Sequence, residues 1–206
     1  MFNRSRSRIR HFALHGVVAF LGIVAGLSPA WSQTDITDAG LPHTADSVLF
    51  EWYEYYAPEN VSNNVLGLGY GSWHSKDTRE GAAFPHWVTI DFGTPRIVTQ
   101  LNILAYSESY DTNLRLKDFR FEGSVDGNTY TPLHQGFLQY ANQHDWQSFY
   151  FQNTAGYRYY RLFGLSNWGC YDVCEQMIIE EWEMFEGGPV PAQTTSWGTI
   201  KARFTK

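Results

Sequence analysis

The sequence is short of charged residues and of cysteine. Of its 206 residues only 17% are charged and two are cysteine, whereas 17% are aromatic and 18 positions are glycine. A chain with few charges and many aromatic and glycine residues is more typical of a β-rich extracellular protein than of a helical cytosolic one.

The motifs of several common enzyme classes are also missing. The sequence has no G-x-S-x-G, no H-E-x-x-H, no P-loop and no dinucleotide-binding fingerprint. The histidines after residue 32 are not spaced as metal ligands, and we interpret His74 and His86 as solvated loop residues. No pattern pairs two carboxylates for acid–base work. We therefore expect neither enzymatic activity nor a cofactor.

The first 32 residues have the pattern of a secretory signal peptide. Four arginines between Arg4 and Arg10 precede an apolar stretch over residues 12–27, and Ala30-Trp31-Ser32 is a small-x-small cleavage site. Sixteen apolar residues are short for a membrane span, although an uncleaved anchor is the alternative. We predict cleavage after Ser32 and export to the periplasm or the extracellular space.

Cleavage would make the protein more acidic. The predicted signal holds four of the 15 basic residues and none of the 21 acidic ones, so the formal charge changes from −6 to −10. An acidic surface repels phosphate backbones and anionic lipids. Nucleic acid is therefore excluded as the expected partner, and membrane lipid is disfavoured. Phe137-Leu138 is the single candidate for an apolar loop tip that could enter a membrane.

The segment from Phe84 to Leu133 has strand-like alternation with turn residues between the runs. Val88, Ile90 and Phe92 alternate with polar residues, and Gly93-Thr94-Pro95 then breaks the run. Further strands are predicted at 97–105, 118–125, 146–151, 157–165 and 177–185, with an aromatic-rich strand within 47–60. Residues 61–86, 134–145 and 167–174 are predicted loops.

Five pieces of the sequence resemble the factor five/eight type C, or discoidin, domain. They are Trp73, PHWVTIDFG, LKDFRFEGSVDG, YRYYRL at 157–162 and EEWEMF at 180–185. The resemblance covers about residues 46–186 and implies an all-β, jelly-roll sandwich of the galactose-binding-like type, with ligand loops at one end. Many bacterial carbohydrate-binding modules share this fold. Residues 33–45 then form a leader, and 187–206 a linker and a short alternating, basic tail.

The two cysteines, Cys170 and Cys174, are expected to form a disulfide in an exported protein. A two-cysteine metal site would need further ligands that are not nearby. A disulfide across so short a loop would fix the loop more than it would stabilise the domain. The family's eukaryotic members instead carry a disulfide that ties the two ends of the domain.

The resemblance also implies a structural calcium site, which this sequence matches poorly. The family's Asp-Gly and Thr before Trp73 fall here on Leu66-Gly67 and Gly71, which lack side-chain oxygen atoms. Glu181 matches the family's C-terminal acidic ligand, and backbone carbonyls also bind calcium. With one side-chain ligand left, we expect no calcium-dependent fold.

The resemblance further implies a sugar site on the end loops. Asn113 matches the family's asparagine, whereas its basic residue falls near Ser107-Glu108 and is absent. Aromatic faces stack on sugars while amides and carboxylates bind hydroxyls. The exchange of a basic for an acidic residue favours neutral sugars. The predicted ligand-binding residues are Tyr106, Glu108, Tyr110, Asp111, Asn113, Trp168 and Tyr171.

Two of these interpretations have alternatives. Trp168 would serve the core if it packed under its own loop, since large aromatic residues are mostly buried. Arg158 and Arg161 match structural arginines of the family. The sequence thus predicts an exported, non-catalytic module that recognises carbohydrate, with a protein-interaction or adhesion module on the same scaffold as the alternative.

Overall fold

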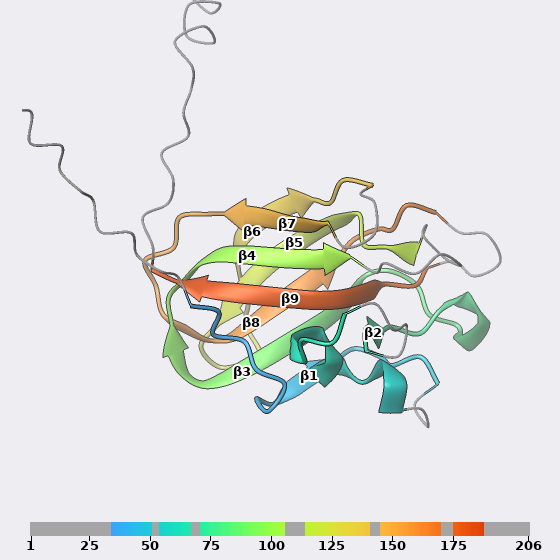
Figure 1. The fold of residues 1–206 in the computed structure, drawn as a ribbon, viewed down its shortest axis with the longest axis horizontal. Helices are drawn as coiled ribbons and strands as arrows, with labels where there is room; N and C mark the ends of the chain where they lie inside the picture. The colour runs from blue at the N-terminus through green and yellow to red at the C-terminus, as the bar shows by residue number, and fades with distance from the viewer. Residues whose placement is uncertain are drawn as a thin grey trace, which may run out of the picture. The chain divides into compact units, whose positions relative to one another are not determined.

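Two antiparallel sheets make up the protein in the computed structural model, which describes residues 34–50, 54–66, 71–105, 114–140, 145–169 and 175–187. One sheet has five strands in the order β1-β3-β8-β5-β6, and the other has four in the order β2-β9-β4-β7 (Figure 1). The strands are β1 His43–Ala45, β2 Trp73–His74, β3 His86–Arg96, β4 Val98–Ala105, β5 Asp118–Ser124, β6 Thr131–Phe137, β7 Trp146–Tyr150, β8 Tyr157–Gly164 and β9 Ile178–Glu186. This arrangement confirms the predicted discoidin-type β-sandwich.

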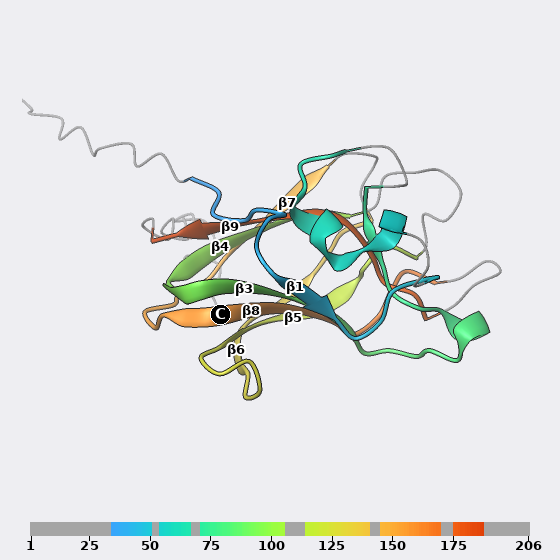
Figure 2. The same cartoon turned by 90° about the horizontal axis from the view of Figure 1, so that it is seen from below.

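Apolar side chains at alternate positions of the strands fill the space between the two sheets. Val88 and Ile90 of β3 are fully buried and face the other layer, in which Trp182 of β9 is also fully buried. Figure 2 shows the two layers edge-on, with β4 and β9 in one and β3, β5 and β8 in the other. Period-2 burial against a second sheet is what holds such a sandwich together.

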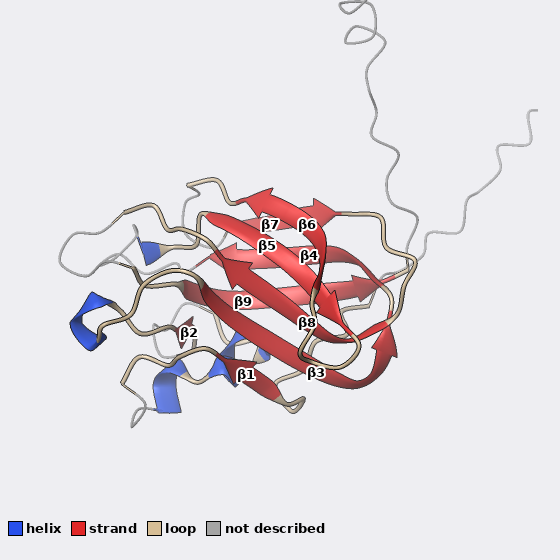
Figure 3. Cartoon of the chain, turned by 180° about the vertical axis from the view of Figure 1, so that it is seen from behind, coloured by secondary structure: helices blue, strands red, loops and turns tan. Residues whose placement is uncertain are grey.

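The aromatic-rich strand expected within 47–60 is wrong for the residues that the structure describes there. Two short 3₁₀ helices, η1 Glu54–Tyr56 and η2 Pro58–Ser62, lie beside β1 and β2 instead (Figure 3). Pro58 starts η2, where its fixed φ suits a helix and its missing N–H costs nothing. The Trp182 indole N–H donates to Ser62 Oγ at 2.7 Å and ties η2 to the core.

A third 3₁₀ helix, η3 Thr78–Glu80, starts after Asp77, whose side chain accepts a hydrogen bond from the Arg79 backbone N–H. Within the described ranges, no helix is long and apolar enough to cross a membrane.

Strand β6 was not predicted, and part of it falls in the expected loop 134–145. It is an edge strand that pairs only with β5, and it contains Pro132. Most of its side chains are exposed or half-buried, so hydrophobic alternation is weak. Similarly, β3 continues through the expected break at Gly93-Thr94-Pro95, although its register with β8 shifts between Asp91 and Arg96.

The described part of the predicted leader packs on the sandwich. Asp35 forms an isolated bridge with Phe185, and the Ile36 N–H donates to the Met184 carbonyl at 2.9 Å. Residues His43–Ala45 then pair with β3 as β1. The sheets therefore include residues that precede the segment covered by the family resemblance.

Candidate functional site

Several strand ends meet at one end of the sandwich, which we call the loop end. In the five-stranded sheet the start of β5 pairs with the end of β6, as Asp118 faces Phe137. In the other sheet the end of β4 lies opposite the start of β9 (Figure 1). A bridge between Arg115 and Ile178 joins the approaches to β5 and β9. The ends of β4, β6 and β8 and the starts of β5, β7 and β9 therefore converge here.

Of the seven predicted ligand-binding residues, the structure describes only Trp168. Both cysteines of the predicted disulfide also lie outside the described residues, so these predictions stay predictions. The undescribed positions are Tyr106, Glu108, Tyr110, Asp111, Asn113, Cys170, Tyr171 and Cys174.

Trp168 is placed at the loop end by its neighbour Asn167. Asn167 forms a bridge with Leu116, and its side-chain amide donates to the Gln176 carbonyl at 2.9 Å. Its Oδ1 accepts the Gly169 N–H at 3.1 Å. One side chain thus joins the residues before and after segment 170–174, and it fixes the backbone that carries Trp168.

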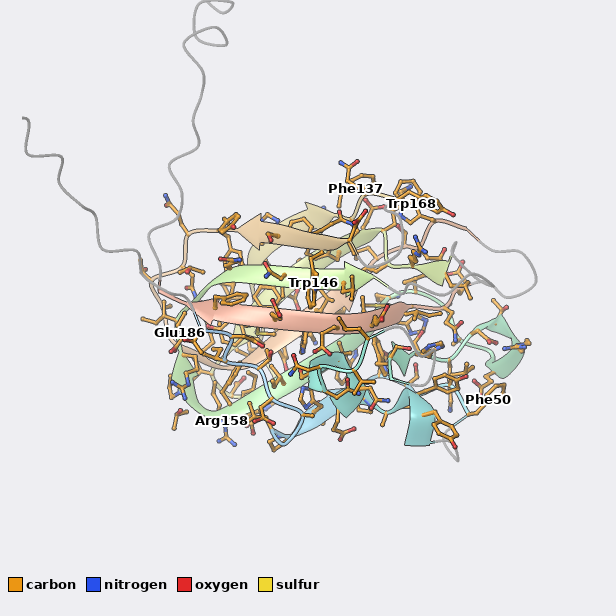
Figure 4. The ribbon with its side chains drawn as sticks, in the orientation of Figure 1. Phe50, Phe137, Trp146, Arg158, Trp168 and Glu186 are labelled. Carbon is orange, nitrogen blue, oxygen red and sulfur yellow. The ribbon has the colours of Figure 1, made fainter. Side chains whose placement is uncertain are left out.

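Phe137 and Tyr140 pack against Trp168, and we call these three residues the aromatic cluster. The ring centroids of Phe137 and Tyr140 lie 5.4 and 5.5 Å from that of Trp168, both edge to face. Figure 4 shows Phe137 and Trp168 together, far from Arg158 and Glu186. Trp168 is half-buried, whereas Phe137 is 42% and Tyr140 52% exposed. The outermost apolar faces therefore belong to the two residues that the sequence did not suggest as sugar ligands.

The backbone that precedes Tyr140 is fixed at two successive residues. Leu138 is fully buried, and its N–H donates to the Lys117 carbonyl at 2.9 Å. Gln147 of β7 accepts the Gln139 N–H at 2.7 Å and donates to the Gln139 carbonyl at 3.1 Å. Because Leu138 belongs to the core, Phe137-Leu138 is not the apolar loop tip that a membrane-binding role requires.

Two cations contact the aromatic cluster. The Lys117 ammonium lies 5.1 Å from the centre of the Trp168 ring, and the Arg115 guanidinium lies 5.5 Å from that of Tyr140. Such contacts are worth about 0.5–2 kcal/mol each. Two rings of the aromatic cluster therefore each have a cationic side chain against them.

The expectation that His74 and His86 are solvated is wrong. They are 6% and 1% exposed. His86 contacts an Asp46 carboxylate oxygen at 2.6 Å and the Glu175 carbonyl at 2.7 Å, whereas His74 contacts Ser72 Oγ at 2.9 Å. Complete burial lowers the pKa of His74 to about 3. His86 therefore joins segments that are distant in the sequence, and both histidines are buried in the fold.

Arg158 and Arg161 are structural, as predicted. Arg158 makes two hydrogen bonds of 2.7 Å to Asp91. Arg161 pairs with the buried Glu122 and lies 3.6 Å from the centre of the Tyr130 ring. Bidentate pairs of this kind fix neighbouring strands, and neither arginine takes part in the aromatic cluster.

The described residues around Glu181 do not fit a calcium site. Glu181 is buried, and its carboxylate accepts the Asn64 N–H at 2.8 Å. Burial raises the pKa of Glu181 to about 8, which disfavours the charged form that binds calcium. The Gly71 carbonyl, a potential ligand, accepts an amide N–H of Asn63 at 3.3 Å. Glu181 and the Gly71 carbonyl therefore each accept a hydrogen bond from the protein itself; Gly67 lies outside the described residues.

Comparison with known proteins matches the F5/8 type C domain to residues 42–176. No curated protein matches the sequence.

Solved structures with the same fold include several carbohydrate-binding modules. CpGH89CBM32-5 from Clostridium perfringens, in complex with GalNAc-β-1,3-galactose, is 15% identical, with a TM-score of 0.58 over 74% of this chain and 99% of that one. The family 32 CBM from C. perfringens NanJ, in complex with galactose, is 14% identical, with a TM-score of 0.59 over 75% and 99%. The CBM32 of AlyQ, in complex with 4,5-unsaturated mannuronic acid, is 20% identical, with a TM-score of 0.54 over 75% and 98%.

Proposed function

The chain belongs to the F5/8 type C domain family, and we propose that it is an exported, non-catalytic module that binds carbohydrate at the loop end. The aromatic cluster is the observation that carries this proposal. Phe137 and Tyr140 expose large ring surfaces next to Trp168 on a rigid sandwich. Aromatic faces of this kind stack on the apolar faces of sugar rings.

The backbone of the cluster is fixed before any ligand arrives. Leu138 anchors one side of Gln139 in the core, and Gln147 holds Gln139 through both its N–H and its carbonyl. Fixing the backbone that carries Tyr140 in advance lowers the entropy lost on binding. The predicted residues Asn113, Asp111 and Glu108 would bind hydroxyl groups of the same sugar.

The structural relatives support a sugar ligand. Galactose, a GalNAc-galactose disaccharide and an unsaturated mannuronic acid are bound by modules that share this fold. Their identities of 14–20% show the fold alone, so the ligand of this chain is our proposal.

Export and the lack of catalysis complete the proposal. Residues 1–32 have the n-region, apolar stretch and cleavage site of a signal peptide. The sequence contains none of the enzyme motifs sought above. His74 and His86, the histidines of the expected long loop, are buried in structural hydrogen bonds. The module would therefore bind a glycan without altering it.

A glycan array followed by calorimetric titration tests the proposal. Tyr140→Ala should weaken binding of the best glycan about tenfold or more, since a stacking ring behaves as a hot-spot residue. Tyr150→Ala is the matched control: Tyr150 is 46% exposed, against 52% for Tyr140, and it pairs with Gln100, away from the loop end. Equal affinities for the wild type and Tyr140→Ala would place the site elsewhere. If no glycan binds at about millimolar concentration, the protein-interaction alternative replaces this proposal.

A further inference from the structure

Lys117 differs from most of the described arginines in what its charge contacts. Five of those arginines pair with carboxylates, whereas the Lys117 ammonium, as far as the structure describes its surroundings, contacts only the Trp168 ring. A ring face occupies one side of an ammonium and leaves its N–H groups available as donors. The five paired arginines are Arg79, Arg96, Arg120, Arg158 and Arg161.

The position of Lys117 is determined by the fold. Its backbone N–H donates to the Ser166 carbonyl at 2.8 Å, and its carbonyl accepts the Leu138 N–H at 2.9 Å. It therefore lies between the segment that carries Trp168 and the segment that carries Phe137 and Tyr140. A charge held between the two halves of the aromatic cluster lies within reach of a substituent on a sugar stacked there.

A second cationic side chain packs on the same cluster. The Arg115 guanidinium lies 5.5 Å from the centre of the Tyr140 ring, on the same cluster. Arg115 is 4% exposed, so of these two cationic side chains Lys117 is the one placed to contact a ligand directly.

We propose that the aromatic cluster binds an acidic sugar, a pyranose bearing a carboxylate or a sulfate, and that Lys117 sets this preference. This inference rests on the proposed carbohydrate-binding function and names its ligand class. The sugar ring stacks on Tyr140 or Phe137, and its anionic group accepts a hydrogen bond from the Lys117 ammonium. A hydrogen bond between two charged groups is about twice as strong as one between neutral groups.

The sequence alone pointed to neutral sugars, because Glu108 and Asp111 stand near the family's basic position. Both lie outside the described residues. Nothing in the sequence marked Lys117 as a ligand-binding residue, since it belongs to the strand motif LKDF. Only the pairing of distant segments places it next to Trp168. The two arguments predict opposite preferences, so a single binding experiment decides between them.

Pairs of sugars that differ in one charged group measure how much that group contributes to the affinity. Galactose, glucose and mannose oligosaccharides are titrated beside oligomers of the corresponding uronic acids, with galactose 6-sulfate as a sulfate probe. In each hexose–uronate pair the C6 hydroxymethyl group is replaced by a carboxylate. At low salt the acidic member of at least one pair should bind about tenfold more tightly, and the preference should shrink as salt rises.

Three variants assign the preference to Lys117. Lys117→Gln should bring the ratio of the affinities for the acidic and neutral members of a pair to about one, whatever the affinity for the neutral member, and Lys117→Arg should retain the wild-type ratio. Arg96→Gln also removes one positive charge, but Arg96 pairs with Glu186, away from the loop end, so the preference should survive. Melting temperatures of all variants show whether each one folds.

The outcomes separate the two levels of the proposal. If neutral and acidic members bind equally, or if the preference survives Lys117→Gln, the inference about Lys117 is overturned and carbohydrate binding stands. If no member of any pair binds, the proposed function fails together with the inference. A preference for the 6-sulfate over the uronate, lost in Lys117→Gln, would support the inference and identify the anionic group as sulfate.

Discussion

The backbone N–H of Asn64 donates to the carboxylate of Glu181 across 2.8 Å, from the segment after η2 to strand β9. Glu181 is the residue that matches the family's acidic calcium ligand. Asn64 has a positive φ of 57°, and the adjacent Asn63 holds the Gly71 carbonyl through its side-chain amide. Hydrogen bonds within the protein therefore join the segment after η2 to β9 and to Gly71.

Removal of calcium should leave the stability unchanged. We expect the melting temperature in EDTA and in millimolar calcium to agree within about 1 °C, because an ion that does not bind the folded state cannot stabilise it. Glu181→Gln keeps an acceptor for the Asn64 N–H and should be tolerated, whereas Glu181→Ala should cost about 1–3 kcal/mol. Scanning calorimetry checks both. A melting temperature that falls in EDTA and recovers with calcium would show that backbone oxygen atoms form a site.

Burial of His74 predicts a loss of stability in mild acid. The pKa of this histidine is lowered to about 3 by burial, against about 6.5 in an unfolded chain. A lowered pKa means that its contribution is complete above pH 6.5 and is lost as the pH falls towards 3. Between pH 7.5 and pH 5 the free energy of unfolding should fall by about 2 kcal/mol from this residue.

Denaturant titrations of the wild type and His74→Gln at the two pH values measure this contribution. We expect the variant to be less stable than the wild type at pH 7.5, because it loses the contact between the His74 and Tyr56 rings. The centroids of these two rings lie 4.2 Å apart. Its stability should nevertheless change less with pH. Burial also lowers the pKa of His43 and His134, so only the difference between the two proteins reports on His74. Identical pH dependence in both would contradict the assignment.

Strong alternation predicted the central strands, and the resemblance to the F5/8 type C domain predicted their arrangement as a sandwich. Val88 and Ile90 face the core in β3, and the predicted strand there exists. The sequence missed β6, an edge strand whose exposed residues show weak alternation. It placed His74 in a solvated loop because nothing local shows that residues 73 and 74 pair with β9.

Only the part of the site that local sequence features reveal could be predicted. Trp168 stood out as an aromatic residue in a loop, and the structure places it at the loop end. Tyr140 and Lys117 could be identified only from long-range contacts. Leu138 is buried in the core, whereas Tyr140 is exposed. The backbone hydrogen bonds of Lys117 to Ser166 and Leu138 place its ammonium against the Trp168 ring. Pairing between distant segments is not encoded in local periodicity.

Gln147 should control glycan affinity without touching the glycan. Its side chain holds the Gln139 backbone through two hydrogen bonds, and Tyr140 is the next residue. Gln147→Ala should weaken binding about five- to tenfold by releasing Tyr140, with a small change in melting temperature, because the bonds are solvent-exposed. Gln147→Glu keeps the acceptor for the Gln139 N–H and loses the donor, so an intermediate affinity is expected. Unchanged affinity in both variants, measured by titration, would show that Tyr140 needs no such support.

The signal sequence should be removed during export. Intact mass and N-terminal sequencing of protein recovered outside the cytoplasm should show a chain that starts at Gln33, because Ala30-Trp31-Ser32 precedes it as a small-x-small site. Replacing Ser32 and Ala30 by large residues should block cleavage at this position. Recovery of a mature chain that retains Met1 would identify residues 1–32 as an anchor.

The loop between Asn167 and Gln176 should be held by two independent links, one of them covalent. Non-reducing mass spectrometry should find the Cys170–Cys174 peptide lighter by two hydrogens, and two alkylated thiols would exclude the disulfide. Closing so short a loop stabilises the fold by about 2 kcal/mol at most on the chain-entropy model. Because Asn167 already donates to Gln176 and accepts from Gly169, reduction alone should lower the melting temperature little. Asn167→Ala combined with reduction should lower glycan affinity by more than the sum of the two separate effects. Each link alone can still hold the loop, whereas the combined change removes both. Strictly additive losses would show that the two links do not hold the same segment.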